Sequence, residues 1–273
     1  MRQQSSLARL LASAATTAIL TAGLAGCQTM SDITGSITSP KSELAASADA
    51  DPRRAVDVYG ERYRANLKDP DAALAYGQAL RATGQRSQAV AVFEQATIGH
   101  PSNKALLAGF GRALVDNGNF QQAFDVLSRA HSPDNPDWRI LSVQGTALDQ
   151  LGRHDEARRY YASALKITPE EPLVLSNLGL SYVLSKDLPK AEQVLRRAYA
   201  SGKADARVRQ NLGLVVGLQG RFGEAETIVK ADLPAEQAAA NVAYLKEMLN
   251  RKDNPRAGNG SIPVASFGDR RTE

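Results

Sequence analysis

A period of 34 residues runs through the chain from residue 70 to about residue 239. Glycine recurs at this spacing at Gly77, Gly111, Gly145, Gly179 and Gly213. Alanine recurs at Ala89, Ala123, Ala157, Ala191 and Ala225, and large apolar residues recur at Phe93, Leu127, Tyr161, Leu195 and Val229. A fixed period of this length is typical of one supersecondary unit stacked on copies of itself. The repeat therefore limits the chain to an elongated fold in which each unit packs on its neighbours.

The spacing of apolar residues inside each unit predicts two helices. Ala191, Val194, Leu195 and Ala198 follow the i, i+3, i+4, i+7 pattern of one helix face. A second glycine series marks the end of each first helix, where a left-handed residue is favourable, at Gly84, Gly118, Gly152 and Gly220. Lys186 stands at this place in the fourth unit, and Asp187 after it can cap the next helix. Because glycine inside a helix costs about 1 kcal/mol relative to alanine, we expect the first glycine series to let each first helix approach the alanines of the second.

This helix–turn–helix period resembles the tetratricopeptide repeat. The resemblance predicts an all-α solenoid with units at residues 70–103, 104–137, 138–171, 172–205 and 206–239. Residues 52–67 are expected to form a half-repeat at the N-terminal end, and residues 235–250 a capping helix at the other end. The repeat domain as a whole is predicted at 51–250, followed by a disordered tail rich in Pro and Gly at 251–273.

The first 26 residues have the order of a secretory signal peptide. Arg2 and Arg9 precede an apolar stretch, which ends in "LAGC" with the single cysteine of the chain, Cys27. "LAGC" resembles the bacterial lipobox, and the resemblance implies cleavage before Cys27 and attachment of lipid to its sulfur. The other interpretation is a chance cysteine in an ordinary signal peptide. Residues 27–50, rich in Ser, Thr and Ala, are predicted to be a flexible tether. Gln28 after the cysteine implies the periplasmic face of the outer membrane, by the sorting rule of enteric bacteria.

Composition and motifs favour a protein that is not an enzyme. The formal net charge is +4, and Arg2 and Arg9 supply half of it, so no nucleic-acid partner is expected. P-loop, zinc-binding and nucleophile-elbow patterns are missing from the sequence, and His100, His131 and His154 stand far apart at expected turns. We therefore expect no cofactor, no metal, no catalytic residue, no small-molecule substrate and no enzymatic activity. An enzyme acting on peptidoglycan or polysaccharide stays open as an alternative, but it would need a constellation that this sequence does not present.

The resemblance also indicates where a partner binds. In these repeats the first helices line a concave groove, and ligands meet the second, fifth, ninth, twelfth and thirteenth positions. The first three units offer mostly polar groups there, including Arg81, Asp149 and the candidate binding residues Arg112 and Arg139. The last two units offer the apolar candidates Leu173, Leu180, Val183, Leu184, Leu214 and Leu218. Such a groove suits an amphipathic helix or an extended hydrophobic peptide. The alternative is that a neighbouring unit or the C-terminal helix buries these side chains.

A lipoprotein signal, a short tether and five such repeats resemble the TadD family of the tight-adherence (Flp) pilus system. The resemblance implies a non-enzymatic outer-membrane scaffold, held to the membrane by its lipid anchor, that helps the secretin pore or other pilus and secretion components to assemble. A different periplasmic adaptor is the alternative, acting as a type IV pilus pilotin, in outer-membrane barrel assembly or as a cell-wall hydrolase regulator.

Overall fold

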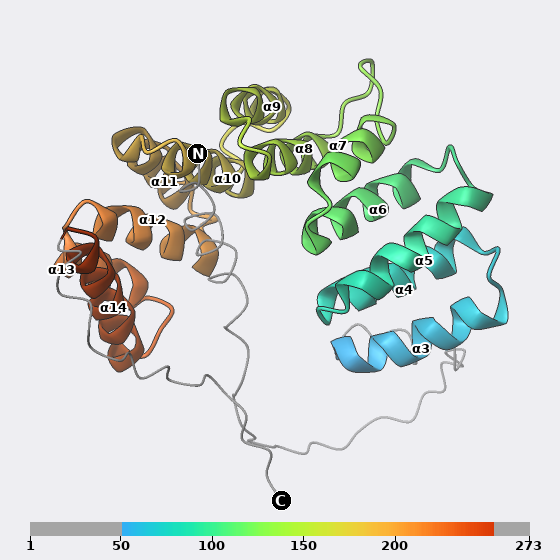
Figure 1. Ribbon diagram of the computed structural model, residues 1–273, viewed down its shortest axis with the longest axis horizontal. Helices are drawn as coiled ribbons and strands as arrows, with labels where there is room; N and C mark the ends of the chain where they lie inside the picture. The colour runs from blue at the N-terminus through green and yellow to red at the C-terminus, as the bar shows by residue number, and fades with distance from the viewer. Residues whose placement is uncertain (1–50, 254–273) are drawn as a thin grey trace, which may run out of the picture.

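A computed structural model describes residues 51–253, which form an arch of packed helices (Figure 1). The first helices of the five units begin at residues 70, 104, 138, 172 and 206. In chain order the helices are α3 (Pro52–Ala65), α4 (Pro70–Ala82), α5 (Arg86–Gly99), α6 (Lys104–Asn117), α7 (Phe120–Ser128), α8 (Trp138–Gln150), α9 (His154–Ile167), α10 (Pro172–Leu184), α11 (Leu188–Ala200), α12 (Ala206–Leu218), α13 (Phe222–Val229) and α14 (Ala235–Asp253). The prediction of an all-α repeat solenoid is confirmed.

The predicted signal peptide and tether, with Cys27, lie outside the described residues, as does the predicted tail beyond residue 253. Helix α14 runs to Asp253, three residues into the range expected to be tail.

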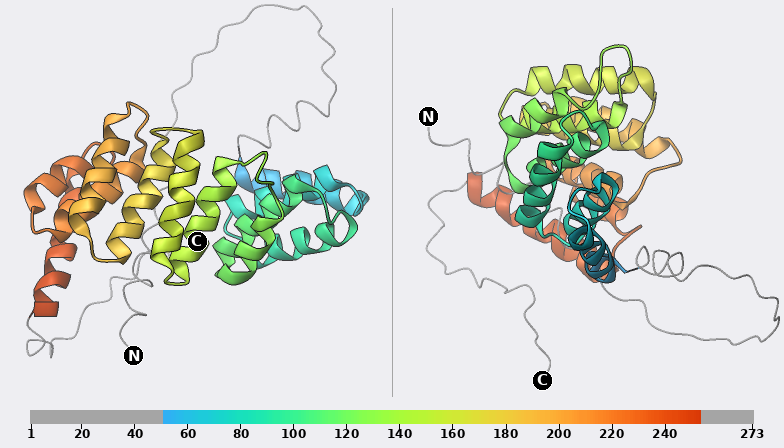
Figure 2. Two further views of the ribbon diagram at one scale, coloured as in Figure 1. Left: turned by 90° about the horizontal axis from the view of Figure 1, so that it is seen from above. Right: turned by 90° about the vertical axis from the view of Figure 1, so that its right-hand side faces the viewer.

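The helices stack so that the first helix of each unit lies on the inner side of the arch. Each first helix contacts the second helix of its own unit and also the first helix of the next unit, from α4 through α12. In Figure 1, α9 and α11 accordingly lie outside α8 and α10, and Figure 2 shows the same stack from two other sides. The arch therefore presents the first helices along its concave surface.

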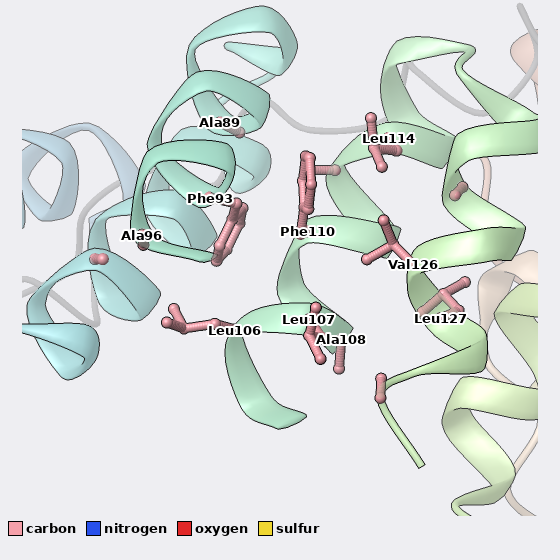
Figure 3. Close-up of a cluster of buried hydrophobic side chains, with 14 of the residues drawn as sticks. Ala89, Phe93, Ala96, Leu106, Leu107, Ala108, Phe110, Leu114, Val126 and Leu127 are labelled. Carbon is pink, nitrogen blue, oxygen red and sulfur yellow. The ribbon is translucent and has the colours of Figure 1, made fainter. Parts of the chain in front are cut away.

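The first glycine series permits close packing, but against a different column from the one expected. A Cβ on Gly77 would lie 2.5 Å from the ring of Phe93, and a Cβ on Gly109 in the next unit would also lie 2.5 Å from that ring. Figure 3 shows Phe93 reaching from α5 toward Leu106 and Phe110 of α6. The large apolar residue of each unit, sixteen positions after the glycine, fills the space that a side chain would need. We expected the alanine column there. The alanines are buried, but the bulkier residues occupy the gap that the glycines leave.

The turns within the units follow the second glycine series. Gly84, Gly118, Gly152 and Gly220 have φ between 76° and 87°, as predicted for the ends of first helices. Lys186 adopts the same conformation with φ 64°. Asp187 caps α11 as expected, because its carboxylate accepts the backbone N–H of Lys190 at 3.2 Å.

Polar residues at the start of the first helices form one more repeating position, which caps the helix N-termini. The side chains of Asp69, Asn103, Asp137 and Asp205 precede α4, α6, α8 and α12 and accept backbone N–H groups of the first turn. Glu171 stands at this place before α10 and makes no such bond. These caps fix where four of the five units begin.

The two end helices cover the ends of the stack. Helix α3 packs on α4, where the Tyr63 and Tyr76 rings lie 5.6 Å apart. Helix α14 packs on α12 and α13, and Leu245 occupies the space beside Gly217, where an added Cβ would lie 2.6 Å from it. The predicted half-repeat and capping helix are thus both present.

Candidate protein-interaction surface

Fewer residues are accessible on the concave surface than the five positions per unit that the sequence predicts, because stacking closes the fifth position in the middle units and the twelfth in the last three. Ser142 and Ser176, at the fifth position of α8 and α10, are buried. The side-chain amide of Asn177 donates to Ser142 Oγ at 3.0 Å, and that of Asn211 donates to Ser176 Oγ at 2.8 Å. Each bond joins one first helix to the next. The second, ninth and thirteenth positions remain accessible along the arch.

The twelfth position is closed in the last three units, which corrects the expectation for Val183. Its side chain is 8% exposed and packs in a cluster with Leu212 and Val215 of the next unit. Val183 therefore holds the fourth and fifth units together and does not line an open groove. The reason is the stacking itself, since α12 lies directly on this face of α10.

The other apolar candidates are covered to different degrees. Leu173 is 36% exposed, and Leu180, Leu184 and Leu214 are half-buried. Leu218 packs against the cluster that contains Val183, to which α14 contributes Val242. The C-terminal helix and the neighbouring units cover some of these residues and leave Leu173, Leu180, Leu184 and Leu214 partly open.

Arginines dominate the N-terminal half of the surface. The Arg139 side chain is exposed and its guanidinium lies 4.6 Å from the centroid of the Trp138 ring. Arg81 Nε donates to Asp116 Oδ2 at 2.6 Å, which links α4 to α6. Arg112 is partly buried, and no hydrogen bond or ion pair holds it among residues 51–253. The two predicted binding arginines, Arg112 and Arg139, therefore lie on the same half of the surface.

Asp149 was expected on the polar part of the groove, and the structure places it in the interior. Its carboxylate accepts the Tyr161 hydroxyl at 2.9 Å and the Ser181 hydroxyl at 2.7 Å, and the His154 Nδ1 atom lies 2.9 Å away. Burial raises the pKa of Asp149, and these hydrogen bonds partly offset that rise. Burial and the nearby Asp149 carboxylate raise the pKa of Tyr161 well above 10. This polar group ties the third unit to the fourth.

No group of three or more His, Cys, Asp or Glu residues between 51 and 253 could hold a metal ion. The His100 and His131 rings hydrogen-bond to the Lys68 carbonyl at 2.8 Å and to Gln144 Oε1 at 3.1 Å. No helix in this range is long and apolar enough to cross a membrane.

A curved stack of helix pairs whose inner side chains are available to another molecule defines a helical-repeat scaffold. The family model described as Tetratricopeptide repeat matches residues 77–137 and 142–207, and the described residues have the helix-pair solenoid fold of that repeat. Proteins of this kind generally hold other proteins and do not catalyse reactions.

Curated relatives match parts of the chain. The chain is 35% identical over 104 residues to the uncharacterized protein y4yS of Sinorhizobium fredii. This alignment covers 37% of this chain and 56% of that protein. It is 30% identical over 145 residues to the cytochrome c-type biogenesis protein CycH of Bradyrhizobium diazoefficiens. This second alignment covers 52% of this chain and 38% of CycH. The chain thus spans less than two thirds of the length of these relatives.

Among solved structures, PilW, described as a widely conserved type IV pilus biogenesis factor, superposes with a TM-score of 0.63 at 18% identity. The superposition covers 74% of this chain and 96% of PilW. At this identity the similarity shows a shared fold.

Proposed function

We propose that this protein is a lipid-anchored scaffold on the periplasmic face of the outer membrane, and that its concave surface holds a component of a pilus or secretin assembly. The observation that carries the proposal is a set of inner side chains that residues 51–253 leave unpaired or partly open. Arg112 lacks an acid of its own within the described residues, and Leu180 and Leu214 remain partly open on the same surface. Covering apolar surface is favourable, and a partly buried charge is stabilised when the partner brings a counter-charge to it.

The membrane location in this proposal is inferred from the sequence. Cleavage of the signal peptide before the cysteine of the lipobox-like "LAGC" would leave Cys27 as the first residue of the mature protein. Acyl chains contribute about 0.8 kcal/mol per buried CH₂, so two or more of them hold a protein stably on a bilayer without a spanning helix. The fold shared with PilW and the resemblance to the TadD family support a role in pilus biogenesis.

Site-specific photo-crosslinking in cells tests the scaffold function. A photoreactive residue at Leu180, on the inner surface of α10, is expected to crosslink to one protein partner, identified by mass spectrometry. The matched control places the same residue at Gln193, which is exposed on α11. Adding Leu184→Asp is expected to abolish the Leu180 crosslink. The proposal fails if Leu180 captures no protein, or if both positions capture the same set.

Fractionation tests the anchor separately. The Cys27→Ser protein is expected to leave the outer-membrane fraction and appear in the soluble periplasm. A processed Cys27→Ser protein that stays in the outer membrane would contradict lipid anchoring, with signal cleavage checked by N-terminal sequencing.

A second adaptor role rests on the 30% identity to CycH, whose description is cytochrome c-type biogenesis. The Leu180 crosslink separates the two roles. A secretin or pilus component favours the first, and a cytochrome-maturation component favours the second.

A further inference from the structure

Three cationic side chains lie on the N-terminal half of the concave surface. Arg81 comes from α4, Arg112 from α6 and Arg139 from α8, so three successive first helices each contribute one. Burial and the positive charges of Arg81 and Arg139 lower the pKa of Arg112, while Asp137 and Asp116 act in the opposite direction. Arg81 and Arg139 therefore each lie close enough to act on Arg112. We call Arg81, Arg112 and Arg139 the arginine site.

The two acids beside the arginine site are already engaged. Asp116 accepts the hydrogen bond of Arg81 at 2.6 Å. Asp137 is the N-cap of α8, where its carboxylate accepts the backbone N–H of Arg139 at 2.8 Å. Neither acid forms an ion pair with Arg112, so the site has one more cation than it has acids, and that cation is partly buried.

An arginine in this position does not lose its charge. The guanidinium stays protonated in proteins, and its five N–H donors match the two oxygens of a carboxylate. A partly buried cation without a counter-charge is unfavourable, and an anion that reaches it restores both hydrogen bonding and charge balance. The open leucines further along the arch add an apolar surface in line with the site.

We propose that the arginine site binds carboxylate side chains of an acidic peptide segment in the partner protein, whose following apolar residues lie on Leu180 and Leu214. This inference rests on the proposed scaffold function and adds the chemistry of the partner. Charge complementarity selects an acidic segment, because a basic or neutral one would leave Arg112 without a counter-charge. The uncharged residues that follow in the segment match the change from arginine to leucine along the arch.

The test uses the full-length protein and two fluorescein-labelled peptides, read by fluorescence polarisation at low ionic strength. One peptide carries a run of glutamates followed by leucines, and the other has glutamines in place of the glutamates. The glutamate peptide is expected to bind more tightly and to weaken as salt is added. Arg112→Gln is expected to weaken it by about tenfold or more, since hydrogen bonds between charged groups are among the strongest. The glutamine peptide should be unaffected by the substitution.

Two further variants keep the test independent of folding. Arg139→Gln changes an exposed side chain of the same site and should also weaken the glutamate peptide. Arg159→Gln removes an exposed arginine on the outer helix α9, away from the concave surface, and should leave the affinity for the glutamate peptide unchanged. The inference is overturned if the two peptides bind alike, if neither binds, or if Arg112→Gln and Arg139→Gln leave the glutamate peptide unaffected.

The cellular crosslink at Leu180 separates this inference from the function on which it rests. If Leu180 captures a partner equally well in the Arg112→Gln protein, the acidic recognition is wrong and the scaffold function stands. If the protein with its native arginines captures no partner, the scaffold function itself is wrong, whatever the peptides do.

Discussion

At Gly111, the absence of a side chain lets α6 lie against α7. A Cβ there would lie 2.3 Å from Leu127 Cγ, an atom near the backbone that has little room to move. Because close-packed interiors tolerate added atoms poorly, each of the five glycines in this column is a packing requirement.

Gly111→Ala is therefore expected to lower the free energy of unfolding by about 1–2 kcal/mol, the cost of overpacking less the gain in helix propensity. Gly223→Ala in α13 is the matched control, because a Cβ there has no neighbour within 4 Å. The control should be neutral or stabilising by up to about 1 kcal/mol. Urea unfolding followed by circular dichroism measures both. Equal effects of the two substitutions would show that packing is not the cause.

Lys186 is the exception to the glycine turns, and it predicts a stabilising substitution. A side chain at φ 64° is strained, whereas glycine takes this conformation at little steric cost. Lys186→Gly is expected to raise the free energy of unfolding by about 0.5–1 kcal/mol, after allowing for the greater freedom of glycine in the unfolded chain. Gly152→Lys, the reverse change in the preceding unit, should destabilise by a similar amount. Denaturation of both variants checks the opposite signs.

Residue columns predicted the helices, the left-handed turns and the cap at Asp187 from local rules alone. They did not predict which side chain meets the glycines, because this depends on how two helices are set against each other. The same limit explains Val183 and Asp149. Both sit at positions that face the groove within one unit, and the next unit in the stack buries them. The open parts of the predicted surface, Arg139 and Leu173 among them, are those that the next unit does not reach.

At the scale of elements, the hydrogen bonds of Asp149 connect α8 to α9 and α10. Its carboxylate receives hydroxyls from Tyr161 on α9 and Ser181 on α10. The junction of the third and fourth units therefore depends on a buried acid as well as on apolar contacts.

The raised pKa of Asp149 gives this junction a pH dependence. A folded-state pKa above the unfolded value means that the native protein holds the proton more tightly. Its contribution to stability is present below the unfolded pKa, near 4, and is lost as pH rises through the folded value. Both proteins are compared with His154→Gln also present, which removes the ionisable side chain beside the carboxylate. The protein that keeps Asp149 should then lose stability relative to the one with Asp149→Asn as pH rises from about 4. Unfolding measured at successive pH values gives the difference, and a constant difference would contradict the assigned cause.

At the scale of the whole molecule, stability is shared between neighbours. Helix α14 shields the end of the stack through Leu245 and Val242, which pack on α12 and its surrounding cluster. In a stack of this kind, damage at one end weakens the adjacent unit first.

Leu245→Asp is accordingly expected to speed amide hydrogen exchange in α12 and α13 while α4 to α6 stay protected. Tyr244→Asp is the control, since Tyr244 is 61% exposed on the same helix. If exchange instead rises equally along the whole arch after Leu245→Asp, the repeats unfold together as one cooperative unit, which would contradict this prediction.

The asparagine–serine bonds between first helices also set how the arch bends. Opening it pulls the first helices apart, which loads the bonds from Asn177 to Ser142 and from Asn211 to Ser176. Between α6 and α8 the same two places hold Ala108 and Val143, whose side chains cannot make this bond. The joint between α6 and α8, inside the arginine site, therefore lacks this link, and a bound segment that spans Arg112 and Arg139 would connect the two helices in its place.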